Sequence, residues 1–391
     1  MMLKNKTDDT GMISHKNTFV YYPLTFYHLI WCYILAKKLD KGERSIVMDK
    51  NLFSDILISN IDNSGFWGEI YVAQKSEEKP PMFQLVQRLF FSKKRCPELF
   101  KLSGVNVVFF SAGSWFCNLW INSIAKSSKI IMAEDGIAPF YFKDLTSGWE
   151  KQIASSSIYT DTKRWIKSFI KNSLNISNVD ELWVSKIDWI SPDILSKIAV
   201  KPVQMNSNDV QSAFGMISDL FLFSDVSLRQ AIDVVYFDHN YGAFLEKEHD
   251  FLLHAKLFSR LKGRYILVKL RYSGGLTENP RVKFFLELRE KYGFNIVLDE
   301  SMSNVPWELI YYKNQDVLKK AVLISSHLST ALLTSKIFFD TNHVIYDFHI
   351  IFLSHIPEVD LKEFSELVAR INRESPLMHI YSPSEFNDVT I

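Results

Sequence analysis

Residues 130–136 read IIMAEDG, a short apolar run that ends directly in two acids and a glycine. Such a run, bounded by a turn signal, is typical of a buried strand. The same arrangement recurs along the chain, where short apolar runs rich in β-branched and aromatic residues alternate with longer segments of helical pattern. This alternation predicts an α/β fold, in which crossover helices connect the strands of parallel sheets.

The positions of the elements follow from the same pattern. Strands are expected at 18–21, 45–48, 69–72, 105–110, 129–133 and 181–184, and then at 231–237, 265–269, 295–298, 321–324, 337–339 and 344–346. Helices are expected at 27–39, 82–93, 115–125, 245–261, 280–292, 307–313, 330–333 and 361–373. Two successive sets of this kind predict two Rossmann-like domains, residues 1–225 and 226–391, that face a central cleft. The last helix could cross back to the first domain.

The composition narrows the class of protein. The chain has 391 residues, enough for two domains, and 47% of them are hydrophobic, enough for a large core. The 45 Lys and Arg nearly balance the 44 Asp and Glu, so the charge gives no reason to expect a nucleic-acid partner. Three cysteines match no zinc pattern and ten histidines show no ligand spacing with carboxylates, so we expect no metal site.

The N-terminal half raises the question of a membrane. Residues 1–16 are polar and lack the apolar core of a signal peptide. Residues 19–36 are strongly apolar, but Pro23 and His28 within them favour a buried strand followed by a helix over a transmembrane span. We therefore expect a cytoplasmic protein. Residues 163–171, KRWIKSFIK, leave peripheral contact with the inner membrane surface open, beside the commoner packed surface helix.

The acids of residues 130–136 are the first candidates for chemistry. Glu134 and Asp135 lie just beyond a strand, where parallel sheets bind ligands, and Gly136 permits a tight turn or a close backbone approach. A pair of acids can hold one carboxyl at a raised pKa, as a general base needs. An ordinary surface turn explains the same residues, because Asp-Gly is common in turns.

The end of a second strand carries two cations. Lys269 and Arg271 stand at i and i+2, hence on one face of the chain, which suits a phosphate or a carboxylate. A solvated strand end is the plain alternative. Further along, Glu308 stands in the first turn of a predicted helix, where it either favours the helix dipole or accepts the hydroxyls of a ribose.

A hydroxyl-rich loop follows the predicted strand at 321–324. Ser326, His327, Ser329 and Thr330 precede or open a helix, so hydroxyls and free backbone N–H groups could form an anion site there. Ser329 could equally be an N-cap only, and His327 an ordinary loop histidine.

Taken together, the order and spacing of these segments resemble the motif pattern of the bacterial sialyltransferase and polysialyltransferase families of capsule and lipooligosaccharide synthesis. Those families carry an acid-acid-Gly motif after a strand of the first domain. Their second domain carries a Lys-x-His-Pro motif, a Pro-x-Glu segment and a Ser-Ser or Ser-Thr pair that opens a helix. This chain has, in that order, Glu134-Asp135-Gly136, Lys269-Leu270-Arg271-Tyr272, Pro306-Trp307-Glu308 and Ser329-Thr330. Residues 22–29, YPLTFYHL, likewise look like the family's first strand and loop.

The resemblance implies the two-domain GT-B fold and metal-independent, inverting transfer of a nonulosonic acid from its CMP ester to a glycan hydroxyl, with no cofactor. It implies that the acid pair supplies the general base, Asp135 before Glu134. Lys269, Ser329 and Thr330 would hold the CMP phosphate, and Glu308 the ribose or the base. Gly136, Ser326 and His327 would be further donor-binding residues. The acceptor could be lipid-linked.

One departure from the family pattern affects the donor site, because Arg271-Tyr272 replaces the His-Pro dipeptide. Arginine cannot act as an acid near neutral pH, but it can neutralise charge on a departing phosphate. His327 could instead take the acid role, or the donor could be CMP-Kdo or a nucleoside-diphosphate sugar. A catalytically inactive GT-B scaffold protein is the alternative from another class.

Overall fold

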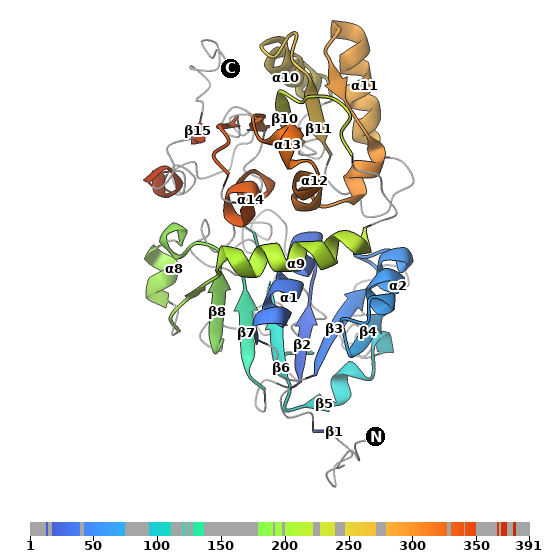
Figure 1. Ribbon diagram of the computed structural model, residues 1–391, viewed down its shortest axis with the longest axis vertical. Coiled ribbons are helices and arrows are strands. Elements are labelled where there is room, and N and C mark those ends of the chain that lie inside the picture. The colour runs from blue at the N-terminus through green and yellow to red at the C-terminus, as the bar shows by residue number, and fades with distance from the viewer. Residues whose placement is uncertain are drawn as a thin grey trace, which may run out of the picture. The chain divides into compact units, whose positions relative to one another are not determined.

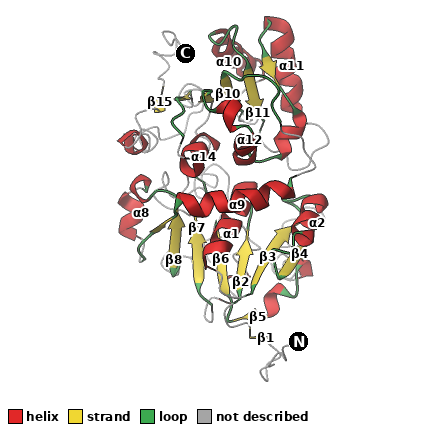
Figure 2. Ribbon diagram, in the orientation of Figure 1, coloured by secondary structure: helices red, strands yellow, loops and turns green. Residues whose placement is uncertain are grey.

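The computed structural model describes residues 13–14, 18–39, 43–74, 94–110, 120–121, 124, 128–136, 179–190, 192–197, 200–221, 227–238, 247–270, 279–326, 330–339, 341–348, 366, 369–373 and 378–380. The chain divides into two compact units, Met1–Leu220 and Phe221–Ile391. Each unit contains a parallel sheet with helices packed against it (Figures 1 and 2).

The sheet of the first unit has seven strands in the order β4-β3-β2-β6-β7-β8-β9, and every pair within it is parallel. The strands are β2 Phe19–Tyr22, β3 Arg44–Asp49, β4 Glu69–Ala73, β6 Asn106–Phe109, β7 Ile130–Ala133, β8 Glu181–Val184 and β9 Val203–Gln204. Among the described residues of this unit, α1 spans Phe26–Leu39, α2 Asp55–Asn63, α8 Pro192–Lys197 and α9 Ser207–Leu220, and short 3-10 turns lie at Leu99–Lys101 and Ile187–Trp189. A separate two-stranded sheet pairs β1 Ile13–Ser14 with β5 Leu102–Ser103. The chain first builds outward through β3 and β4 and then returns to the other side of β2, so the order reverses between β2 and β6.

Helix α1 explains the long apolar stretch near the N-terminus. Residues 28–36 are all buried, because α1 packs on β2 and is covered by α9. A helix that is apolar on all sides is expected to be enclosed in this way. The stretch 19–36 is therefore a strand and a buried helix, as predicted. None of the helices in the described part of the chain combines the length and apolar character needed to cross a bilayer.

The sheet of the second unit has six parallel strands in the order β12-β11-β10-β13-β14-β15. The strands are β10 Val234–Phe237, β11 Ile266–Lys269, β12 Ile296–Val297, β13 Val322–Ser325, β14 Ile345–Asp347 and β15 Met378–Ile380. In the described part of this unit, α10 spans Lys247–Ser259, α11 Pro280–Tyr292, α12 Trp307–Lys313, α13 Gln315–Leu318 and α14 Thr330–Phe339, and a 3-10 segment lies at Glu300–Asn304. The order reverses between β10 and β13, which makes the carboxyl ends of these two strands the expected ligand edge.

The core of the second unit lies between this sheet and the pair α10 and α11. Tyr236 from β10, Phe258 from α10 and Phe285 from α11 are fully buried and meet in edge-to-face or stacked ring contacts. Helix α11 begins with its N-cap Asn279 and Pro280 and ends at Gly293, whose φ of 68° is the left-handed conformation that glycine tolerates.

One predicted strand is wrong. Residues 337–339, predicted as a strand, instead form the last turn of α14. The run Ile-Phe-Phe has β propensity, but Leu332, Leu333 and Phe338 are buried on the helix and packing overrides local propensity. Helices α2 and α9 were not predicted. The expected helix at 82–93 and the cationic segment 163–171 lie outside the described residues.

Candidate functional site

The acid pair lies at the carboxyl edge of the first sheet. Glu134 follows β7 directly and is fully buried. It accepts a hydrogen bond from the hydroxyl of Tyr27 at one oxygen. Its other oxygen accepts the backbone N–H of Ser185 at 2.7 Å and the Ser185 hydroxyl at 2.6 Å. Burial raises the pKa of Glu134 to about 7, although the Ser185 and Tyr27 donors oppose that rise. With three donors and no exposure, Glu134 anchors the strand end rather than facing a substrate.

Asp135 is placed differently. A third of its side chain is exposed, and its Oδ1 lies 2.7 Å from Nε2 of His28. Nδ1 of His28 accepts the backbone N–H of Leu24 at 3.2 Å. Because Nδ1 is an acceptor, Nε2 carries the hydrogen and donates it to Asp135. The imidazole is 2% exposed and stacks on Phe110, with ring centroids 4.4 Å apart and planes 7° from parallel.

Four segments therefore meet at this edge. Tyr27 and His28 belong to the first turn of α1, just after β2; Phe110 follows β6; Ser185 follows β8. The carboxyl ends of parallel strands share one edge, so residues far apart in the chain come together at the point where the strand order reverses. Gly136, directly after the acids, has a φ of 57°, in the left-handed region that favours glycine. Glu134 and Asp135 were predicted from the sequence as site residues, whereas His28, Tyr27 and Ser185 were not.

In the second unit, Lys269 and Glu308 interact. Lys269 ends β11 and donates to the carbonyl of Leu270 at 2.9 Å and to that of Ser303 at 3.5 Å. Burial lowers the pKa of Lys269 to about 8, and the negative charge of Glu308 opposes this shift. Glu308, in the first turn of α12, is itself buried. Burial raises its pKa, while its own backbone N–H, the hydroxyl of Thr334 and the charge of Lys269 act against the rise.

The hydroxyl-rich segment lies at the carboxyl end of β13. Ser325 and Ser326 are buried, and the Ser325 hydroxyl lies 3.4 Å from the carbonyl of Phe237 on the neighbouring β10. Thr330, partly exposed, is the first residue of α14. The N–H groups of a first helical turn lack partners within the helix and attract anions. Arg271, His327 and Ser329 lie outside the described residues.

A buried charged cluster, which the sequence analysis missed, lies beside β10. Asp238 follows β10 and accepts two hydrogen bonds from Arg281, at 2.9 Å from Nε and 2.7 Å from Nη2. Nη1 of Arg281 donates to Asp250 on α10 at 2.5 Å. Although burial opposes it, the carboxylates of Asp238 and Asp250 raise the pKa of the Arg281 guanidinium. His254 and Tyr236 complete the cluster, with the Tyr236 hydroxyl 2.6 Å from Nε2 of His254.

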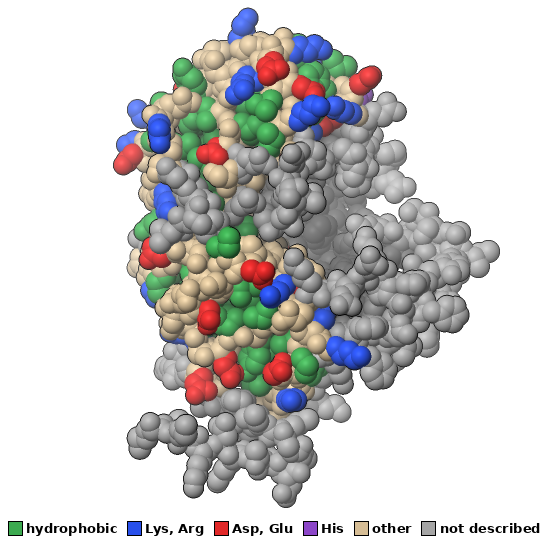
Figure 3. All heavy atoms as spheres, turned by 90° about the vertical axis from the view of Figure 1, so that its right-hand side faces the viewer, with side chains coloured by type: hydrophobic (Ala, Val, Ile, Leu, Met, Phe, Trp, Pro, Cys, Tyr) green, Lys and Arg blue, Asp and Glu red, His purple; other side chains and the backbone are tan. Residues whose placement is uncertain are grey.

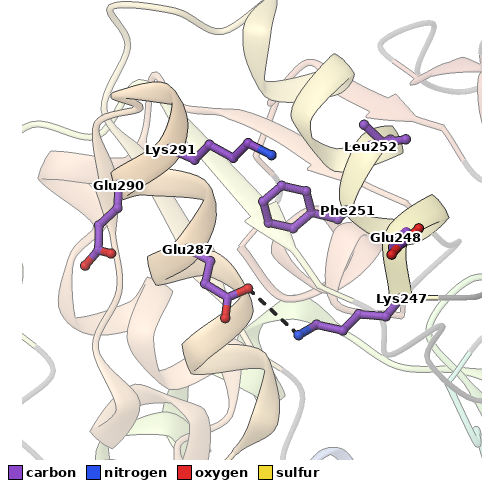
Figure 4. A pocket seen from close by; sticks show the side chains of 7 residues that line it. All are labelled: Lys247, Glu248, Phe251, Leu252, Glu287, Glu290 and Lys291. Atoms are coloured by element: carbon purple, nitrogen blue, oxygen red, sulfur yellow. Dashed lines mark ion pairs between the residues drawn. The ribbon is translucent and has the colours of Figure 1, made fainter.

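A pocket of about 800 Å³ is lined by residues of α10 and α11: Lys247, Glu248, Phe251, Leu252, Glu287, Glu290 and Lys291 (Figure 4). Lys247 approaches Glu287 at 3.9 Å, and the ammonium of Lys291 lies 5.2 Å from the ring centre of Phe251. The pocket is lined by charged side chains of both signs, and the face drawn in Figure 3 likewise carries both signs on its described residues. Among the described residues, no three His, Cys, Asp or Glu side chains gather as metal ligands.

The chain matches no protein-family model and no curated protein sequence. Among solved structures, MnaA of S. aureus with UDP superposes with a TM-score of 0.53 at 12% identity, covering 96% of this chain and 87% of that one. UDP-GlcNAc 2-epimerase from Methanocaldococcus jannaschii gives 0.49 at 9% identity, covering 96% and 92%. Spinosyn forosaminyltransferase SpnP gives 0.47 at 11% identity, covering 95% and 87%. At these identities the likeness concerns the fold alone. The fold is the α/β GT-B type with two Rossmann-like units, as the sequence predicted.

Proposed function

We propose that the chain is an inverting, metal-independent glycosyltransferase that moves sialic acid or a related nonulosonic acid from its CMP ester to a hydroxyl of a surface glycan. The observation that carries the proposal is the partly exposed carboxylate of Asp135, held by the Nε2–H of His28 at the carboxyl edge of the first sheet. In the second unit, Lys269 and Ser326 stand at the carboxyl ends of β11 and β13, and Thr330 opens α14. Ligands bind at this edge in folds of this class.

The reaction assigns one role to each group. Asp135 takes the proton of the acceptor hydroxyl, and the acceptor oxygen forms a bond to the anomeric carbon. The bond from that carbon to the phosphate oxygen of CMP breaks, and its electron pair leaves with CMP. A single displacement of this kind inverts the configuration. Glu134 fixes the backbone next to Asp135, because it is buried and accepts three hydrogen bonds.

Donor binding is assigned to the second unit. Glu308 would accept the ribose hydroxyls or contact the base, and Lys269, Ser326, His327, Ser329 and Thr330 would hold the phosphate. Arg271 would neutralise the departing CMP in place of the histidine that the resembling families carry. The glycan would belong to capsule or lipooligosaccharide. A lipid-linked acceptor at the inner membrane would suit the cationic segment 163–171.

Nucleotide binding tests the proposal. A thermal shift series with CMP, CDP, UDP and GDP compares the four ligands on one preparation, because a ligand that binds the native state raises the melting temperature. We expect a shift with CMP and little with the diphosphates. A shift with a diphosphate only would overturn the CMP donor and leave an ordinary nucleotide-sugar transferase. CMP binding without turnover would instead support the inactive scaffold.

A further inference from the structure

The loop that connects β2 to α1 is held by hydrogen bonds to the first turn of that helix. Thr25 is the residue immediately before α1, and it is exposed. Its hydroxyl oxygen accepts the backbone N–H of His28 at 3.2 Å, and its carbonyl oxygen accepts that of Leu29 at 3.0 Å. Thr25 is therefore the N-cap of α1, because its side chain accepts an N–H that has no partner within the helix.

His28 returns a hydrogen bond to the same loop, since its Nδ1 accepts the backbone N–H of Leu24 at 3.2 Å. In an ordinary capping box the N-cap side chain accepts the N–H of the third helical residue, and the side chain of that residue accepts a backbone N–H at the start of the helix. Thr25 and His28 form such a reciprocal pair. A histidine takes the place of the usual Glu or Gln, and the N–H that it accepts belongs to Leu24, one residue before the cap.

The histidine gives this capping box a consequence that Glu or Gln would lack. A neutral imidazole carries one hydrogen, which cannot be on Nδ1 while that nitrogen accepts the N–H of Leu24. The hydrogen is therefore on Nε2, which lies 2.7 Å from Oδ1 of Asp135. The capping box thus determines which nitrogen of His28 donates to the acid.

The first turn of α1 bonds to both acids of the pair. The hydroxyl of Tyr27 donates to Glu134, and Nε2 of His28 donates to Asp135, so consecutive residues of the helix bond to consecutive residues after β7. The following residues, 29–36, are all buried, and α1 packs on β2 and against α9. The body of the helix is therefore fixed by packing, whereas the direction of its first turn depends on the cap at Thr25.

We infer that Thr25 is a positioning residue for the transfer reaction, acting through His28 on Asp135. The inference rests on the proposed function, in which Asp135 is the base that deprotonates the acceptor hydroxyl. A base must hold its carboxylate in a fixed direction, because small displacements of a catalytic group lower the rate. Thr25 holds the first turn of α1, the N–H of Leu24 selects the hydrogen position on His28, and Nε2–H holds the carboxylate.

Thr25→Ala in the full chain tests the inference with two readouts. The change removes the cap and disturbs little packing, since Thr25 is exposed. Initial rates with CMP-sialic acid and a mixture of glycan acceptors should show kcat reduced about fivefold, the effect of one ordinary hydrogen bond, with the Kd for CMP unchanged. Proton–nitrogen correlation spectra of protein labelled at histidine should show the Nδ1 signal of His28 displaced from its wild-type position. The signal is identified by its loss in His28→Phe.

Ser54→Ala is the matched control. Ser54 is the N-cap of α2, and its hydroxyl oxygen accepts the backbone N–H of Leu57 at 3.3 Å, the same bond three residues along the chain. Both alanine variants should lower the melting temperature by similar amounts, but Ser54→Ala should keep the wild-type kcat and His28 signals. Thr25→Ser retains the hydroxyl and should restore both. An equal loss of kcat in Ser54→Ala would mean that any weakened cap slows the enzyme and would overturn the inference.

The other outcomes separate the inference from the proposed function. Wild-type kcat and unchanged His28 signals in Thr25→Ala would overturn the inference and leave the proposed function intact. A higher KM for the acceptor with unchanged His28 signals would also overturn it, because Thr25 would then contact the acceptor directly. A wild-type chain that transfers nothing from CMP-sialic acid would overturn the proposed function, whereas a displaced Nδ1 signal in Thr25→Ala would still show that the cap controls His28.

Discussion

Nε2 of His28 lies 2.7 Å from Oδ1 of Asp135, although the two residues are 107 positions apart in the chain. Both nitrogens of the imidazole are occupied, since Nδ1 accepts the N–H of Leu24. While these bonds hold, His28 can orient the carboxylate but cannot take a proton from a substrate. Asp135 is the member of the pair that solvent reaches, and we therefore treat it as the base and His28 as its positioning residue.

Replacing Asp135 by Asn should remove transfer while nucleotide binding stays near wild type. General base catalysis contributes roughly 10²- to 10⁴-fold, so we expect kcat to fall by that amount. Initial rates and CMP titrations on the same protein separate the two effects. Asp62→Asn, at an exposed position on α2, is the control and should leave both unchanged. Full activity in Asp135→Asn would show that another group is the base.

His28→Phe should lower kcat roughly ten- to a hundredfold, because a hydrogen bond to a charged group contributes about 1.5–3 kcal/mol. Phenylalanine keeps a ring to stack on Phe110 and loses the donor to Asp135. The Kd for CMP should not change. Phe110→Leu makes the complementary change, since it removes the stacked ring and keeps the hydrogen bond. It should lower the free energy of unfolding and change kcat little. The positioning role fails if His28→Phe retains the wild-type kcat.

Glu134 should make stability depend on pH. Its pKa is about 7 in the folded protein and near 4.5 in the unfolded chain, so between these values the folded state binds a proton that the unfolded state has released. The contribution of Glu134 to the free energy of unfolding is therefore present at low pH and falls by roughly 3 kcal/mol as the pH rises through this window. Glu134→Gln cannot titrate and should lack that dependence.

Urea unfolding of wild type and Glu134→Gln at about pH 5, 6 and 7 measures this difference. As the pH increases, the unfolding free energy of the wild type should fall relative to that of Glu134→Gln. Glu98→Gln, at an exposed position, should follow the wild type. Parallel curves for wild type and Glu134→Gln would contradict the raised pKa.

Arg281→Met should destabilise the second unit by about 3–5 kcal/mol, the range for removing one partner of a buried ion pair. The change leaves Asp238 and Asp250 buried without their cation. Arg289→Met, at an exposed position of the same helix α11, should stay within about 0.5 kcal/mol of wild type. Chemical unfolding of both variants provides the comparison. Equal stability of the two would mean that the cluster contributes little.

Local pattern predicted most of the described strands within one to three residues at either end, and the bounds of α11 and α12. Buried parallel strands are continuous apolar runs, so they are visible in a single sequence. The final turn of α14 was misassigned because local propensity favoured a strand. Helix α9 was not predicted because polar residues are interspersed along it, so the apolar face that packs on α1 was not recognised.

The site was predicted in part for a related reason. Glu134 and Asp135 follow a strand and could be named from that alone. That His28, Tyr27 and Ser185 lie beside them depends on which strands are neighbours in the sheet. Local periodicity does not reveal the order of the strands. Asp238 and Arg281 are 43 positions apart in the chain, so their pairing likewise could not be predicted from local sequence.

Release of CMP from CMP-sialic acid in the presence of a mixture of glycan acceptors, measured side by side for wild type and Asp135→Asn, decides whether Asp135 is the base of a CMP-dependent transfer. We expect CMP release coupled to a new glycoside in wild type, and loss of both in Asp135→Asn, although that variant still binds CMP. Undiminished release in Asp135→Asn would rule out Asp135 as the base. Wild-type release from a UDP-sugar and none from CMP-sialic acid would rule out the CMP donor.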